Sequence, residues 1–262
     1  MATLEWINQH IPVPAIDHWW QTESGWPMIA NMMGVERLPI KPGSSGKVVA
    51  GYDVRIFNEN GQELAPNEEG YVVIKLPLPP GTLLDLWKDN ERFKAGYLNK
   101  FPGYYFSGDG GYRDEEDYIF ITGRVDDVIN VAGHRLSTAE MEEVVASHPS
   151  VAECAVIGIN DDLKGQVPLA LVVAKSGEEI ESFQLQYEVV KLVRDTIGAV
   201  ASLRDVAMVE RLPKTRSGKI LRKMMRSIAD GEEFQIPSTI DDEAIIDEIE
   251  TVLKNAKIGY FK

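Results

Sequence analysis

Residues 137–174 read STAEMEEVVASHPSVAECAVIGINDDLKGQVPLALVVA, and they indicate how the C-terminal half of this chain folds. Ser137 and Glu140 have the spacing of a capping box, and apolar residues follow at helical spacing, so we expect a helix to begin here. The two apolar runs that come next, residues 151–159 and 167–174, are typical of strands. This stretch therefore predicts one helix followed by two strands.

The alternation of helices and strands continues toward the C-terminus. Apolar periodicity predicts further elements there: helices over residues 181–197, 217–229 and 242–256, and a strand over residues 205–209. This βαβ-like pattern indicates a small α+β domain. We place its boundary near Asp126, so that residues 126–262 form the domain.

The N-terminal half has a different pattern, because prolines and tryptophans crowd its beginning. Four of the five tryptophans fall within residues 1–26, and we expect residues 1–45 to be irregular. Strands are predicted within residues 46–76 and over 118–121, while residues 77–103 indicate a loop with a short helical piece. Residues 1–125 are thus predicted to be a β-rich unit. The fold class expected for the whole chain is α/β in the broad sense, of the α+β kind.

Composition and charge exclude several classes of protein. The chain has 262 residues, 44% of them hydrophobic and 26% charged, as in ordinary globular domains. Its net charge of −14 argues against binding nucleic acids or anionic membranes as the main task. No apolar run approaches the ~18 residues of a membrane span, and the N-terminus has no signal or transit pattern. The single cysteine, Cys154, is expected to be an inert core thiol and fits a reducing compartment, so we expect a cytoplasmic location.

The stretch RLPKTRSGK, residues 211–219, carries four cations in nine residues. Such cations repel one another unless an anion lies among them, and the helix that Ser217 is predicted to cap would add the positive end of its dipole. The stretch therefore indicates a site for a phosphate or a carboxylate, with a solvated basic loop as the alternative. The acidic tract over residues 231–250 is interpreted as a solvated helix face.

Two glycine-rich stretches place acidic side chains where a ligand could approach closely. In SGDGG, residues 107–111, the Asp109 carboxylate could accept hydrogen bonds from both hydroxyls of a ribose, and a plain glycine turn is the alternative. In GRVDD, residues 123–127, Arg124 and Asp126 could form a salt-bridge cluster, a second ribose contact or a hinge. Both stretches are candidate parts of a binding site.

The stretch DHWWQTESG, residues 17–25, combines an aromatic pair with polar side chains. Thr22 could donate a hydrogen bond to a phosphate oxygen, and the Glu23 carboxylate could bind Mg²⁺, which prefers oxygen ligands. The two tryptophans would either shape a small apolar pocket or pack in the core. Arg135 could reach a phosphate or lie on the surface, and the histidines have no spacing typical of zinc ligands.

Taken in order, five segments resemble the acyl-adenylate-forming (AMP-binding) enzymes, in particular the acetyl-/propionyl-CoA synthetase branch. The segments are WWQTESG at residues 19–25, YFSGDGG at 105–111, ITGRVDD at 121–127, NVAGHR at 130–135 and LPKTRSGK at 212–219. The resemblance implies that residues 1–125 form the β-rich C-terminal part of a large AMP-binding domain. Residues 126–262 would then form a small mobile α+β lid domain.

The resemblance also implies roles for individual residues. Lys219 would be the catalytic cation, brought to the site as the small domain rotates about Asp126. Trp20 would wall the acyl pocket, Glu23 would hold Mg²⁺, and Gly133 would border the channel for CoA. The adenine, phosphates and ribose of the nucleotide would contact Asp17, Thr22, Asp109, Arg124 and Arg135.

The activity implied by the resemblance is ATP-dependent activation of a short-chain acid. Propionate or acetate, ATP and CoA would give acyl-CoA, AMP and pyrophosphate, with Mg²⁺ present and no nucleic acid or membrane as partner. The chain departs from the family, because it has no Ser/Thr/Gly-rich phosphate loop and no larger N-terminal part. We therefore expect a partial chain that works with a missing N-terminal half, and an inactive nucleotide- or CoA-binding remnant is the alternative. A leader on that missing half would place the protein in the mitochondrial matrix.

Overall fold

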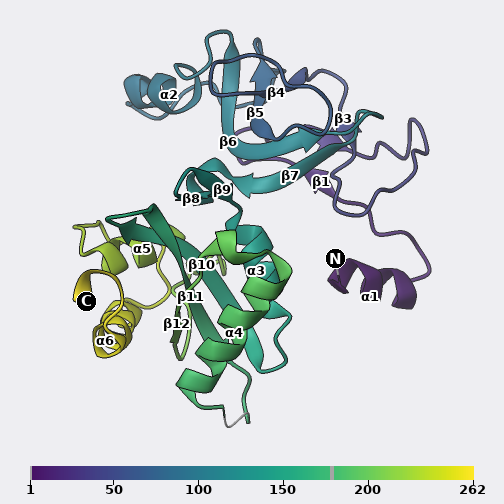
Figure 1. The fold of residues 1–262 in the computed structure, drawn as a ribbon. Coiled ribbons are helices and arrows are strands. Elements are labelled where there is room, and N and C mark those ends of the chain that lie inside the picture. Colours follow the sequence, from purple (N-terminus) through teal and green to yellow (C-terminus); the bar gives the residue numbers. More distant parts are fainter. Residues whose placement is uncertain (1, 178–179) are drawn as a thin grey trace. The chain divides into compact units, whose positions relative to one another are not determined.

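The computed structural model describes residues 2–177 and 180–262, which fall into two compact units (Figure 1). The first unit covers Met1–Asp126 and the second covers Asp127–Lys262. Helices and antiparallel sheets occur in both units, so the predicted mixed α+β fold class is confirmed. No helix in the described part of the chain is long and apolar enough to cross a membrane.

A four-stranded antiparallel sheet forms the body of the first unit. In spatial order its strands are β4 (Val54–Phe57), β5 (Gly70–Lys75), β6 (Tyr104–Arg113) and β7 (Ile119–Arg124). Residues 107–111 therefore lie in a strand, and the glycine turn considered for them is wrong. The glycines in this stretch are untypical of a strand, so the sequence does not indicate one. At least one of them, Gly111, is nevertheless required for β6 to pair with β7. A Cβ on Gly111 would lie 2.5 Å from the carbonyl oxygen of Phe120 on the neighbouring strand.

The remaining elements of the first unit correct one prediction and confirm another. Residues 1–45, expected to be irregular, contain ordered elements: α1 (Ala2–His10), β1 (His18–Trp19) and β2 (Ile29–Ala30), the last of which pairs with β3 (Lys47–Val48). The small sheet forms because Trp19, Met28 and Ile29 are buried in one cluster with strands of the larger sheet. The short helical piece expected within residues 77–103 is α2 (Asn90–Tyr97).

A five-stranded sheet is the centre of the second unit. Its strands are β8 (Ile129–Val131), β9 (His134–Leu136), β10 (Val151–Asp161), β11 (Gly165–Ala174) and β12 (Asp205–Met208). The long β10 and β11 pair antiparallel, and β12 runs parallel to β11. The three strands predicted here are confirmed, whereas the short hairpin β8–β9 has too few residues to stand out in the sequence.

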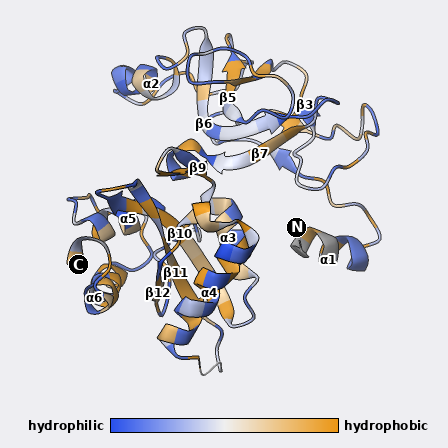
Figure 2. Ribbon diagram, in the orientation of Figure 1, coloured by the Kyte–Doolittle hydropathy of each residue, from blue (hydrophilic) through white to orange (hydrophobic). Residues whose placement is uncertain are grey.

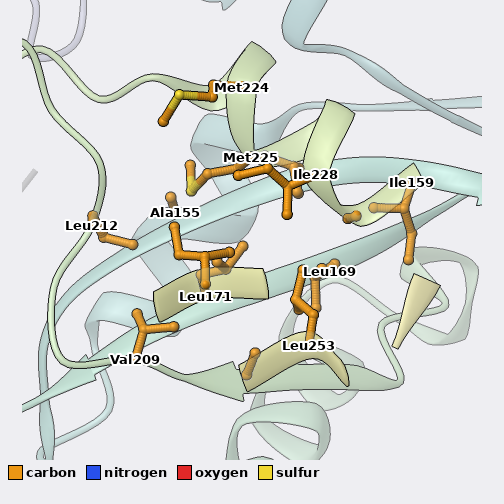
Figure 3. Packing of buried hydrophobic residues seen from close by; sticks show 14 of the residues in the cluster. Ala155, Ile159, Leu169, Leu171, Val209, Leu212, Met224, Met225, Ile228 and Leu253 are labelled. Carbon is orange, nitrogen blue, oxygen red and sulfur yellow. The ribbon is translucent and has the colours of Figure 1, made fainter. Parts of the chain in front are cut away.

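Helices pack against this sheet to form two hydrophobic clusters (Figures 1 and 2). One cluster involves α3 (Thr138–Ala146) and α4 (Ser182–Thr196), and the other involves α5 (Arg222–Asp230) and α6 (Ile245–Ala256). Alternate residues of β10 supply the two clusters: Cys154 and Val156 belong to the first, Ala155 and Ile157 to the second. Figure 3 shows how Met225, Ile228 and Leu253 close around Leu169 and Leu171 in the second cluster. Short 3₁₀ helices complete the chain: η1 (Val125–Asp127), η2 (Ala199–Ala201) and η3 (Gly259–Phe261).

The starts of two helices test the capping predictions. Ser137 caps α3, accepting a hydrogen bond from the backbone N–H of Glu140 at 3.4 Å, as its spacing predicts. The helix predicted over residues 217–229 begins only at Arg222, and Ser217 does not cap it. Residues before Arg222 instead form a tight turn in which Lys214 and Ile220 pair as in a β-ladder. The expected dipole contribution of this helix at residues 217–219 is therefore wrong.

Candidate functional site

In the first unit the site is centred on Asp109, which lies in β6 and is 7% exposed. Its carboxylate oxygen Oδ2 accepts hydrogen bonds from Trp19 Nε1 at 3.2 Å and from Gln21 Nε2 at 2.7 Å. The other oxygen, Oδ1, accepts one from Arg124 Nη1 at 3.3 Å. Three donors from two segments of the chain therefore fix the orientation of this carboxylate.

The strand register brings Arg124 to Asp109. The two residues are direct partners in the β6–β7 ladder, and Arg124 also donates to the Ser107 carbonyl at 3.0 Å. Gly108 makes this possible: it has a φ of 75°, and a Cβ on it would lie 2.5 Å from Arg124 Nη2. The glycine next to Asp109 is therefore required by the close approach of the guanidinium.

Arg124 links two carboxylates. Besides contacting Asp109, it donates through Nε to Asp126 at 3.1 Å, so the salt-bridge cluster considered for residues 123–127 is present. Burial raises the pKa of the Asp109 carboxyl above its ordinary value, and the Arg124 charge opposes that rise. The guanidinium is half exposed, whereas Asp109 is buried, so Arg124 is the member of the pair that can move.

A chain of side chains connects Asp109 to Glu23. The Gln21 amide oxygen accepts a hydrogen bond from Tyr105 at 2.8 Å, and the ring of Tyr105 stacks on Tyr97 at a centroid distance of 5.4 Å. Tyr97 in turn donates its hydroxyl hydrogen to Glu23 at 2.9 Å. Sequence reasoning gave no role to Gln21, Tyr97 or Tyr105. The first and third lie inside the quoted motifs, but nothing in the sequence singles out Tyr97.

The other predicted residues of the N-terminal motif lie at the surface. Asp17 is exposed and accepts a hydrogen bond from the N–H of His18, and Thr22 is exposed as well. The two tryptophans have different surroundings, because β1 ends at Trp19 and Trp20 follows it outside the strand. Trp19 is buried against Asp109, while Trp20 is 52% exposed.

Glu23 is the residue expected to hold Mg²⁺. Within residues 2–177 and 180–262 no group of three or more histidine, cysteine or acidic side chains is arranged to hold a metal ion. Glu23 is a half-buried carboxylate, and the Tyr97 hydroxyl is bound to its Oε1. Mg²⁺ often takes only one or two carboxylates and completes its shell with water and substrate phosphates. Glu23 therefore fits as a single protein ligand.

In the second unit, Lys219 lies in an exposed turn between β12 and α5. Thr215 closes the turn twice: its N–H donates to the Lys219 carbonyl at 2.9 Å, and its hydroxyl accepts from the Lys219 N–H at 3.1 Å. Gly218, with a φ of 83°, allows the chain to reverse. In the described part of the chain the Lys219 ammonium has no ion-pair partner.

The protein's own carboxylates neutralise the other cations of the basic tract. Arg211 pairs with Asp242 and Glu248, Lys214 pairs with Glu153, and Arg222 pairs with Glu142. The reasoning that an outside anion must lie among the cations of residues 211–219 is therefore wrong for Arg211 and Lys214. The acidic tract is more than a solvated face, because Asp242 and Glu248 belong to it. Within residues 211–219, Arg216 and Lys219, at the tip of the turn, are the cations that are exposed without an ion pair among the described residues.

Gly133 and Arg135 belong to the hairpin β8–β9. Ala132 and Gly133 form its turn, with φ values of 49° and 89°, and the Gly133 N–H donates to the Asn130 side chain at 3.1 Å. Arg135 follows on β9, exposed and opposite Asn130 in the ladder. The hairpin thus presents a glycine and an arginine on an exposed edge.

A basic pocket that sequence reasoning missed lies at the end of α4. It has a volume of about 280 Å³, and Lys164, Arg194 and Arg204 line it without any acidic residue. Lys164 donates a hydrogen bond to Ser202 at 2.9 Å, which holds its ammonium at the pocket. Lys164 lies 30 and 40 residues before Arg194 and Arg204 in the sequence, so no local motif indicates the pocket.

Comparison with known proteins identifies the family. Residues 140–219 match the model of the AMP-binding enzyme C-terminal domain. The mouse mitochondrial acyl-CoA synthetase short-chain family member 3 is 50% identical over 258 residues, which are 98% of this chain and 38% of that protein. Residues 140–219 of this chain therefore carry the C-terminal domain of AMP-binding enzymes.

Two CoA ligases are also similar to this chain over most of its length. Escherichia coli propionate–CoA ligase is 43% identical over 258 residues, covering 96% of this chain and 41% of the ligase. The crystal structure of an anthranilate CoA ligase with anthranoyl-AMP superposes with a TM-score of 0.72 at 30% identity, over 86% of this chain and 42% of that one. The chain thus spans about two fifths of the length of these relatives. The matched C-terminal domain ends at Lys219.

Proposed function

We propose that this chain acts in an ATP-dependent short-chain acyl-CoA synthetase, which joins propionate or acetate to CoA through an acyl-adenylate. The observation that supports this best is Lys219, an exposed ammonium at the last position of the matched domain. When a carboxylate attacks the α-phosphate of ATP, two anions meet, and a mobile ammonium offsets their repulsion. Lys219 is therefore the proposed catalytic residue for adenylation.

The proposed nucleotide site in the first unit is built on Asp109 and Arg124. A carboxylate has about four acceptor positions, so three internal donors leave room for about one more. Asp109 can accept both hydroxyls of a ribose if the half-exposed Arg124 moves aside and donates to the same sugar. Asp17 would meet the adenine, and Thr22 and Arg135 would meet phosphate oxygens.

The remaining roles in the first unit follow from its exposed groups. Glu23 would be a single carboxylate ligand for the Mg²⁺ that accompanies ATP, because its second oxygen is available beside the one that Tyr97 binds. Trp20, with its ring half exposed, would form a wall against a short acyl chain. A flat indole at that position leaves little room for long chains, which supports propionate or acetate as substrate.

The proposed hinge between the two half-reactions is Asp126. The chain passes from one compact unit to the other directly after this residue, within the short helix η1. The pair between Asp126 and Arg124 is exposed, so its loss costs little when the backbone rotates. Lys219 would approach the nucleotide for adenylation and withdraw for thioester formation.

The basic pocket of Lys164, Arg194 and Arg204 supports CoA as the second substrate. CoA carries several phosphate charges, and a concave site with three cations and no carboxylate favours such a ligand. Gly133, exposed in its turn, would border the path of the pantetheine arm. Changing Arg194 to Glu should raise KM for CoA about tenfold or more and leave pyrophosphate exchange unchanged. An equal loss in both assays would contradict this role.

The activity can be tested in a chimera in which this chain replaces the matching 258 residues of the E. coli ligase. We expect this chimera to form propionyl-CoA from propionate, ATP, Mg²⁺ and CoA. Lys219→Ala should lower pyrophosphate exchange about 100-fold or more and spare thioester formation from supplied propionyl-AMP. Lys223→Ala, which removes an exposed lysine four residues later, is the matched control and should change neither rate.

The outcomes separate the proposal from its alternative. A folded chimera that binds AMP and CoA without forming propionyl-CoA would favour an inactive nucleotide- or CoA-binding remnant. Equal rates with acetate and propionate would support a short-chain acid as substrate and would show no preference between these two acids. We propose a cytoplasmic location or the mitochondrial matrix, the latter because the mouse relative is named as mitochondrial.

A further inference from the structure

The turn that carries Lys219 rests on a segment beyond the matched family domain. We call residues 237–248 the C-terminal brace. Its backbone runs beside the first arm of the turn: the Arg216 N–H donates to the Thr239 carbonyl, and the Asp241 N–H donates to the Lys214 carbonyl, both at 2.9 Å. Because Thr215 and Ile240 pair between these bonds, the brace adds a third strand to the Lys214–Ile220 pairing.

The hydrophobic core holds the brace in place. Ile240 is 4% exposed and lies in the same cluster as Leu212, which immediately precedes the turn (Figure 3 shows Leu212). After Ile240 the chain enters α6, whose Ile245 and Ile249 are buried in that cluster too. The backbone contacts of the brace therefore connect the turn to the packed body of the second unit.

A side-chain clamp adds to these backbone contacts between the brace and the stretch that carries the turn. The Arg211 guanidinium binds Glu248 in bidentate fashion, with Nε and Nη2 at 3.0 Å and 2.7 Å from its two oxygens. Its Nη1 lies 2.8 Å from Asp242. A bidentate pair fixes direction as well as distance, so Arg211 holds the start of the motif against the brace.

We infer that the C-terminal brace is a positioning element for Lys219, and that Arg211, Asp242 and Glu248 are its positioning residues. This inference rests on the proposed function of Lys219. The brace holds the turn at Arg211, Lys214 and Arg216. Lys219 therefore moves together with the second unit, and the turn that carries it does not move independently. None of the three clamp residues needs to touch the substrate.

The first test is limited digestion of the 262-residue chain with trypsin, which cuts after Arg216 and Lys219 only when the turn opens. Glu248→Gln should speed these two cuts about two- to tenfold, since exposed ion pairs contribute modestly. Glu250→Gln is the matched control, because it removes the same charge from α6 at an exposed position. Arg211→Lys should fall between the wild type and Arg211→Gln, because a lysine cannot form the bidentate pair. Equal cleavage in the Glu248 and Glu250 variants at equal melting temperature would overturn the inference.

The second test uses the chimera with the E. coli ligase. Glu248→Gln should lower kcat for adenylation about two- to tenfold with KM for ATP unchanged, and spare thioester formation from supplied propionyl-AMP. A loss shared by both half-reactions would overturn the inference, because it would indicate general damage. If the proposed function is wrong but the brace does hold the turn, the results differ from these. Lys219→Ala would then leave the rate of adenylation unchanged, while Glu248→Gln would still speed digestion by trypsin.

Discussion

Asp109 is a carboxylate that the fold buries and then surrounds with donors. Trp19 and Gln21 approach it from one segment and Arg124 from another, and only Arg124 is substantially exposed. Such an arrangement fixes the carboxylate before any ligand arrives, which lowers the entropy that binding must overcome. At the scale of single residues the site is therefore preorganised around one acidic side chain.

The pKa of Asp109 gives a prediction for stability against pH. Because burial raises this pKa above its ordinary value of 3.8, the folded protein binds the proton more tightly than the unfolded chain does. The contribution of Asp109 to stability is present below pH 3.8 and is lost as the pH rises through the raised pKa. The free energy of unfolding of the wild type, minus that of Asp109→Asn, should fall over this window. Urea titrations between about pH 3 and pH 7 measure it, and a difference that rises with pH would contradict the assignment.

Tyr105 gives a second prediction at this scale. It is 2% exposed, and its hydroxyl donates to the Gln21 amide oxygen. Tyr105→Phe leaves that oxygen without its donor inside the protein, so we expect a loss of about 1–3 kcal/mol in the free energy of unfolding. Tyr104→Phe on the same strand is the control, and it should change stability by less than about 0.5 kcal/mol. The free energy of unfolding is measured by urea denaturation. Equal losses in the two variants would show that the hydrogen bond from Tyr105 to Gln21 does not contribute to stability.

At the scale of elements, the pairing of β6 with β7 depends on glycine. Gly111→Ala would place a methyl group 2.5 Å from a backbone oxygen, so it should cost about 1–3 kcal/mol. Gly96→Ala in α2 should have the opposite sign and add about 0.5–1 kcal/mol, because a Cβ there meets nothing within 4 Å and alanine favours helix. Thermal unfolding of the two variants measures both effects. A stable Gly111 variant would mean that the strands separate easily at this point.

Comparison of sequence and structure shows which elements could be predicted. Long apolar runs such as β10 and β11, and a capped helix such as α3, follow from periodicity, because burial dominates their energetics. The strand β6 could not be predicted, since its glycines serve close approach and not packing. For the candidate site, the sequence indicated Asp109, Arg124 and Lys219. It could not reveal Tyr97, whose partner Glu23 is 74 residues away.

The whole molecule contains separate cores on either side of Asp126. One pair of hydrophobic clusters belongs to the first unit and the other pair to the second. We therefore expect scanning calorimetry of the chain to show two transitions, with Gly111→Ala lowering the temperature of one by several degrees and leaving the other in place. A single transition that shifts as a whole would contradict independent cores.

The alternating burial of β10 has a consequence for the tolerance of the gene to mutation. From residue 154 to residue 159 both faces of the strand are buried against apolar side chains. No position in that interval therefore faces water, where a polar substitution would be tolerated. A saturation library scored for abundance should therefore contain few surviving polar variants at residues 154–159. Inserting a single residue there would exchange the contents of the two layers at once.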